Sequence, residues 1–225
     1  MKRTKLIDRK LPNYTRGEEI FNMVSHIVGG GFGIIVLISC LIYSILFSNA
    51  YGIIGSLIYG SSMVLLYTMS SLYHGLKNET AKKVFQIIDH CTIFILIAGT
   101  YTPILLCKII PANAMLGWGI IALVWGVSTI GIVLNAIDLK RYSIFSMICY
   151  IGLGWCIMLG GKTALNAIPK PALIYIIAGG VAYTVGAVIY AIAKKMKLKY
   201  VHSIFHLFVV LGSIIQYIGI IFYIL

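Results

Sequence analysis

Residues 199–224 read KYVHSIFHLFVVLGSIIQYIGIIFYI, and no charged side chain follows Lys199 in this stretch. A helix of about 20 apolar residues crosses the hydrocarbon core of a bilayer, so the stretch is long enough to span a membrane. Lipid offers the backbone no hydrogen-bond partners, and the span must therefore be helical. His202 and His206 interrupt its apolar character near one end.

Six further stretches of similar length and composition precede this one. The seven predicted spans are 20–47, 52–76, 83–107, 114–136, 142–162, 171–193 and 199–224. Of the 225 residues, 60% are hydrophobic and 11% are charged, whereas soluble domains have about a quarter of their residues charged. We therefore predict an all-α fold, a polytopic seven-transmembrane helix bundle, with a basic cytoplasmic segment over 1–18 and a single membrane domain over 19–225.

The distribution of Lys and Arg predicts the orientation. Fifteen of the eighteen lie on one side, in the N-terminal segment and in the loops around Lys82, Arg141 and Lys197, and only Lys108, Lys162 and Lys170 lie on the other. Cytoplasmic loops carry such an excess, so we expect the N-terminus inside and the C-terminus outside the cell membrane of a bacterium. The net charge of +12 then reflects membrane orientation and not binding of nucleic acid.

Titratable side chains within the spans gather near the cytoplasmic surface. His74 lies three residues before Lys77, Asp89 six residues after Lys83, and His202 three residues after Lys199. At 1.5 Å per residue these positions are roughly 5–9 Å deep on the same side. Because ionisable groups inside a membrane are costly, each is a candidate for a functional role.

The spacing of His202 and His206 places both imidazoles on one helix face, close enough to bind one ion. With His74 and Asp89 at a similar depth, the set predicts a metal site, and three imidazoles with a water or carboxylate suit Zn²⁺. The alternative is that the histidines form hydrogen bonds between helices.

The first span carries Glu19, Asn22 and His26 on one face, at offsets of three and seven residues. They either line the same cavity or tie the first helix to its neighbours. Asp89 and His90 are adjacent, so their side chains diverge by about 100° and only one faces the ion. Asp89 is favoured, because a carboxylate can accept a proton from a water molecule on the metal.

Four of these stretches also resemble a known family. They are GEEIFNMVSHIVGG (17–30), SSLYHGLK (70–77), IIDHCTIFILIAGTYTP (87–103) and YVHSIFHL (200–207). From about Arg16 onward the chain resembles the hemolysin III family, the bacterial branch of the superfamily of progestin and adipoQ receptors and alkaline ceramidases.

The resemblance implies a ligand set of His74, His202 and His206 for zinc. It also implies that Asp89 holds a water on the ion and that Ser70 is a nearby polar support. His26 and His90 do not belong to the receptor pattern and leave open a fourth protein ligand.

Three functions remain open from the sequence. The first is a zinc-dependent hydrolase in which Asp89 is the general base and Ser70 polarises a lipid amide or ester. The second is a non-catalytic receptor or regulator in which zinc holds helices together. The third is the cytolytic activity that the family name implies. We expect the bilayer and a lipid substrate or ligand as partners, and the sequence specifies no oligomeric state.

Overall fold

The computed structural model describes residues 4–196 and 198–225, apart from the side chains of Lys194 and Lys195. Lys2, Arg3 and Lys197, which belong to the charge count above, lie outside the described residues. The described part is helical almost throughout and contains no strand. The prediction of an all-α fold is confirmed.

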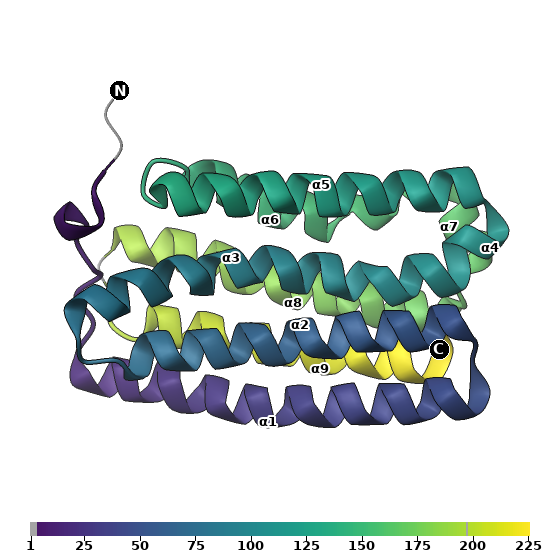
Figure 1. The fold of residues 1–225 in the computed structure, drawn as a ribbon, viewed down its shortest axis with the longest axis horizontal. Coiled ribbons are helices and arrows are strands. Elements are labelled where there is room, and N and C mark those ends of the chain that lie inside the picture. Colours follow the sequence, from purple (N-terminus) through teal and green to yellow (C-terminus); the bar gives the residue numbers. More distant parts are fainter. Residues whose placement is uncertain (1–3, 197) are drawn as a thin grey trace.

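Long helices run side by side along one axis of the molecule (Figure 1). They are α1 (Arg16–Phe47), α2 (Ala50–Gly75), α3 (Glu79–Ile104), α5 (Ala114–Asp138), α6 (Ser143–Gly154), α8 (Lys170–Lys195) and α9 (Val201–Tyr223). After α3 the chain continues through a π-helical turn, η2 (Leu105–Ile109), into α4 (Ile110–Ala112), and after α6 through a 3-10 turn, η3 (Cys156–Gly160), into α7 (Gly161–Ala167).

Among the described residues, six helices are long and apolar enough to cross a membrane. The pair formed by α6 and the η3–α7 segment gives a seventh crossing when it is taken as one bent span. The third span, Glu79–Ala112, is longer than predicted because helical structure continues through η2 and α4. The chain is a multi-pass membrane protein.

Asparagine side chains begin several of these helices. Asn49, Asn78 and Asn113 accept hydrogen bonds from backbone N–H groups in the first turns of α2, α3 and α5. The start of α1 is a capping box, in which the Thr15 and Glu18 side chains each accept from the other residue's backbone N–H. These caps satisfy N–H groups that would otherwise lack partners at the membrane surface.

The first helix packs one face against the bundle and exposes the opposite face. Its inward face carries small and polar residues every three or four positions, and these are Glu18, Asn22, His26, Gly29, Gly33, Val36, Cys40 and Ser44. Ile27 and Ile35 on the opposite face are exposed, as expected for side chains that contact lipid. Small residues let helices approach closely, and a Cβ on Gly60 of α2 would lie 2.5 Å from the Leu37 Cα.

The fifth predicted span, 142–162, is bent. The axes of α6 and the following η3–α7 segment differ by 46°. Tyr101 of α3 lies at the break, where its hydroxyl donates to the Gly154 carbonyl at 2.8 Å and accepts from the Ile157 N–H at 3.1 Å. Lipid cannot form hydrogen bonds with the backbone groups that a break in a helix leaves unpaired. The two hydrogen bonds of Tyr101 therefore allow the break to lie within the membrane.

The N-terminal segment crosses one end of the bundle. It contains a short 3-10 turn, η1 (Leu6–Asp8), and its Thr4 N–H donates to the Asp138 carboxylate of α5 at 3.0 Å. Lys83 of α3 donates to the Ile7 carbonyl at 3.0 Å. The helices α1, α3 and α9 begin and α2 ends at this same end, while the C-terminus lies at the other (Figure 1).

Candidate metal centre

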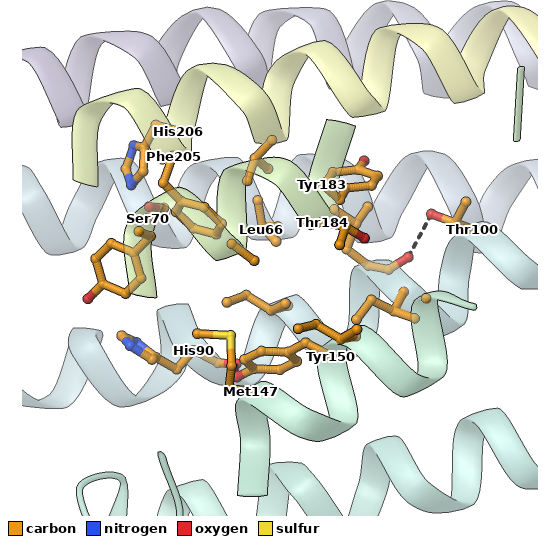
Figure 2. Close-up of a pocket in the computed structure, with 18 of the residues that line it drawn as sticks. Leu66, Ser70, His90, Thr100, Met147, Tyr150, Tyr183, Thr184, Phe205 and His206 are labelled. Atoms are coloured by element: carbon orange, nitrogen blue, oxygen red, sulfur yellow. Dashed lines mark hydrogen bonds between the residues drawn. The ribbon is translucent and has the colours of Figure 1, made fainter. Parts of the chain in front are cut away.

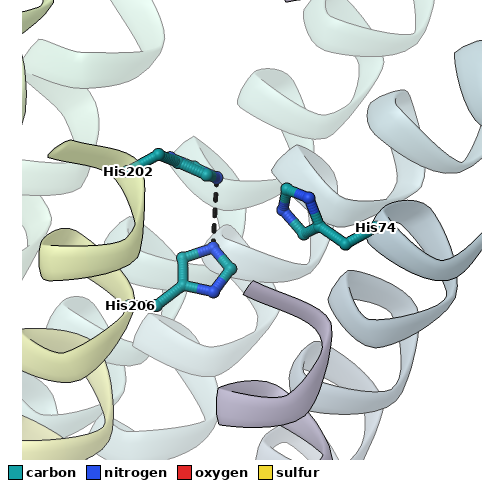
Figure 3. Close-up of side chains that lie close together, drawn as sticks. All are labelled: His74, His202 and His206. Atoms are coloured by element: carbon teal, nitrogen blue, oxygen red, sulfur yellow. Dashed lines mark hydrogen bonds between the residues drawn. The ribbon is translucent and has the colours of Figure 1, made fainter. Parts of the chain in front are cut away.

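Three histidines from two helices meet at the end of the bundle that the N-terminal segment crosses. His74 comes from the last turn of α2, and His202 and His206 from the first turns of α9 (Figure 3). One ring nitrogen of each lies within 4.8 Å of one ring nitrogen of the other two. His74 and His206 are each about 3% exposed or less, and His202 is partly buried. We call these three residues the histidine cluster.

The separation of the two α9 histidines suits a shared metal ion. The Nε2 atoms of His202 and His206 are 3.1 Å apart. Two nitrogens bound to a tetrahedral ion at 2.0–2.1 Å would be about 3.3 Å apart. The two imidazoles on α9 therefore already have nearly the separation that a shared ion requires.

Glu19 fixes the His74 ring. Its Oε2 lies 2.7 Å from His74 Nδ1, and its Oε1 lies 2.8 Å from Lys82 Nζ. A carboxylate only accepts hydrogen bonds, so Nδ1 carries a proton, and a ring in its neutral form would have its lone pair on Nε2. His74 Nε2 is buried and has no hydrogen-bond partner among the described residues. A carboxylate behind a histidine in this way is a common support of a metal ligand.

Contacts from α1 also hold the α9 histidines. His206 Nδ1 lies 3.4 Å from Ser25 Oγ, which leaves its Nε2 toward His202. One turn earlier, the Ser203 hydroxyl donates to Asn22 Oδ1 at 2.6 Å. Asn22 and Glu19 therefore tie the first helix to α9 and α2, respectively.

Tyr14 of the N-terminal segment covers the cluster. Its ring stacks on His202 with centroids 5.2 Å apart and lies 5.8 Å from the His74 ring. Burial raises the pKa of the Tyr14 phenol above its ordinary range, so this side chain is neutral at physiological pH. The cover is thus an uncharged aromatic ring.

His26 lies against the cluster without joining it. Its ring stacks on His206 with centroids 3.6 Å apart and an interplanar angle of 8°. Imidazole lone pairs lie in the ring plane, so two parallel rings at this distance do not direct their nitrogens at the same ion. In this arrangement His26 is not a fourth ligand.

A cavity of about 170 Å³ adjoins the cluster (Figure 2). Its walls are largely apolar, and its polar lining at the cluster end includes His26, Ser70, Asp89, His202 and His206. Asp89 is 7% exposed and does not belong to the group of mutually close ligand atoms. The structure therefore brings its carboxylate to the same cavity but not to a ligand position.

His90 lies across the cavity from His206 (Figure 2). Its Nδ1 lies 2.8 Å from the Gln86 carbonyl, to which it donates, and 3.6 Å from Asp89 Oδ2. Both Asp89 and His90 line the cavity, although adjacent helical residues were expected to diverge.

The roles of four residues around the histidine cluster were not anticipated from the sequence, and these residues are Tyr14, Glu18, Ser25 and Lys82. Glu18 accepts from the Tyr200 N–H at 2.7 Å and so holds the start of α9. Its only sequence signal is the capping-box spacing from Thr15. Ser25 and Lys82 contact residues far away in the sequence, and no local pattern marks them.

A family model and individual relatives among known proteins both match this chain over most of its length. A family model described as "Haemolysin-III related" matches residues 14–217. The chain is 36% identical over 208 residues to the protein named Hemolysin-3 of Bacillus cereus, covering 92% of each chain. It is 35% identical over 214 residues to the Hemolysin-3 homolog of Bacillus subtilis (strain 168), covering 93% of this chain and 96% of the relative.

Proposed function

The chain belongs to the hemolysin III family, and we propose that it binds Zn²⁺ through the histidine cluster and hydrolyses an amide or ester bond of a lipid. The observation that carries the proposal is that three mutually close imidazole nitrogens adjoin a cavity that is also lined by a carboxylate. His74, His202 and His206 would hold the ion. Three neutral nitrogen ligands with an open position are typical of catalytic zinc sites.

The protonation pattern of the cluster supports this fit. With the proton on Nδ1 toward Glu19, a neutral His74 ring has its lone pair on Nε2, and this buried atom has no hydrogen-bond partner in the part of the chain that the structure describes. A buried nitrogen of this kind costs stability unless a ligand satisfies it. A bound Zn²⁺ would supply a Lewis acid and lower the pKa of a water molecule to near 7.

Asp89 would then transfer the proton during hydrolysis. Asp89 would accept a proton from the attacking water as its oxygen bonds to the acyl carbon. The proton would pass to the leaving nitrogen or oxygen as its bond to that carbon breaks, which yields a carboxylic acid and an amine or alcohol. Ser70, also in the cavity wall, would help to hold the substrate.

The apolar walls indicate that the substrate is a lipid. Leu66, Ile93 and Val209 line the cavity between helices that face a bilayer. An acyl chain lying along such walls would have its carbonyl end near the histidine cluster. The polar and apolar parts of the cavity thus match the two parts of an acyl lipid.

The test is acyl release by the purified protein from a panel of ceramides, acylglycerols and phospholipids, with and without a chelator. We expect release from at least one class, and its loss when the chelator removes zinc. Full zinc occupancy without chelator-sensitive release from any of them would contradict hydrolysis and favour the second function, a receptor or regulator in which zinc holds α2 to α9. Cytolysis rests on the relatives' printed names, and no cavity or surface among the described residues adds to it.

A further inference from the structure

His26 is a buried polar side chain whose hydrogen-bonding capacity is unused. It is 3% exposed, and neither Nδ1 nor Nε2 has a hydrogen-bond partner among the described residues. Most buried polar side-chain atoms in proteins have such a partner, and an exception calls for an explanation. Binding of a metal by the cluster would not supply one, because the stacked His26 ring does not face the same ion.

The ring is held in a defined orientation at the cavity. His206 covers one face, and Tyr67 approaches at an angle of 75° with centroids 5.0 Å apart. His26 is also part of the cavity wall, together with Asp89 and Ser70. A fixed ring with a free donor and a free acceptor beside a cavity is suited to recognise a polar group of a ligand.

We propose that His26, as a neutral imidazole, donates a hydrogen bond to the acyl carbonyl oxygen of the bound lipid. The inference rests on the proposed function, because it takes the ligand to be an acyl lipid whose carbonyl lies at the cluster. The His26 ring, stacked on His206, lies in the cavity wall at the end where that carbonyl would lie.

The chemistry favours a carbonyl oxygen over other ligand groups. A neutral imidazole has one N–H donor and one acceptor nitrogen, and the walls beyond it are apolar. A carbonyl oxygen accepts this N–H, and the bond strengthens as negative charge develops on the oxygen during attack. His26 would therefore both orient the substrate and stabilise the transition state.

The experiment compares a lipid that has the carbonyl with one that lacks it. The probes are monododecanoylglycerol and its dodecyl ether, and binding to the zinc-containing protein is measured in an Asp89→Asn background to prevent turnover. His26→Phe keeps a flat ring against His206 but removes both nitrogens. We expect it to weaken binding of the ester about tenfold, the size of one hydrogen bond, and to leave binding of the ether unchanged.

Infrared spectroscopy with an isotope-labelled ester carbonyl gives a readout that is independent of turnover. In His26→Phe, we expect the carbonyl band of the bound ester to move toward the frequency that the ester has in detergent micelles. In His26→Gln, we expect the band to keep part of the lowering in frequency that a hydrogen bond causes. Unchanged ester binding and an unchanged band in His26→Phe would overturn the inference. If neither probe bound saturably to the parent protein, the proposed lipid function would fail and the inference with it.

A second pair of variants covers the case in which His26→Phe does not fold. His26→Gln, which has a donor, is compared with His26→Leu, which has none. A lower frequency of the ester carbonyl band in the glutamine variant would support the proposal. Identical bands in both variants would contradict it.

Discussion

Glu19 on the first helix accepts a hydrogen bond from Nδ1 of His74 on the second, at 2.7 Å. The contact orients the His74 ring so that Nε2 is left for the cluster. Because Lys82 pairs with the other carboxylate oxygen at 2.8 Å, Glu19 is held from both sides. In the proposed zinc site, Glu19 would therefore support His74 from behind and would not itself be a ligand.

We expect Glu19→Gln to lower zinc affinity by about 10–100-fold, because a neutral amide polarises the His74 ring less than a carboxylate does. The matched control is Glu79→Gln, which removes the same charge from an exposed carboxylate paired with Lys83. Competition with a chelating dye measures both affinities. Equal affinities in the two variants would show that Glu19 does not support the metal.

Changing His202 or His206 to Ala is expected to remove most of the zinc from the purified protein, because two ligands do not hold the ion as three do. His90→Ala is the control, since His90 lines the cavity but lies outside the cluster. Metal analysis of each variant gives the zinc content per chain. Full zinc in a His202→Ala, His206→Ala double variant would end the metal hypothesis.

The helices could be predicted from the sequence because each is an apolar run long enough to cross a bilayer. The proximity of His202 and His206 also followed from their spacing, since positions four apart share a helix face. The proximity of His74 to these two histidines was inferred only from their similar depth in the membrane. Depth does not specify toward which side of the α2 axis the His74 side chain points. Its ring orientation depends on Glu19, which is 55 positions away in the sequence.

Two features could not be predicted from local patterns. The bend between α6 and α7 depends on Tyr101 of α3, whose hydroxyl satisfies backbone groups on both sides of the break. The position of Tyr14 over the cluster involves ring contacts with His202 and His74, which are far from it in the sequence. Both are tertiary contacts, and apolar periodicity does not encode them.

Tyr14→Ala is expected to make zinc removal by a water-soluble chelator faster, because it removes the ring that stacks on His202. Tyr51→Ala, at the opposite end of the bundle and on an exposed face, serves as the control. The rate of zinc loss from detergent-solubilised protein measures the difference. The same rate in both variants would show that the N-terminal segment does not limit access to the cluster.

The charge distribution predicts that the two termini lie on opposite sides of the membrane, with the N-terminus inside. The start of α1 and the C-terminus lie at opposite ends of the bundle, which agrees with an odd number of spans (Figure 1). Reporter fusions after Asn49 and at Leu225 are expected to report an external location, and a fusion after Lys77 a cytoplasmic one. A cytoplasmic signal from Leu225 would contradict both the orientation and the seven-span count.

The final prediction separates catalysis from structural support. Asp89→Asn is nearly isosteric, and Asp89 lies outside the group of mutually close ligand atoms, so the variant should keep both the fold and the metal. The amide cannot take the proton of the attacking water, so chelator-sensitive acyl release should fall by at least about 100-fold. Zinc content and release are measured on the same preparation. If zinc were structural, the change would mainly lower the thermal stability of a buried site, and any acyl release would persist at the level of the parent protein.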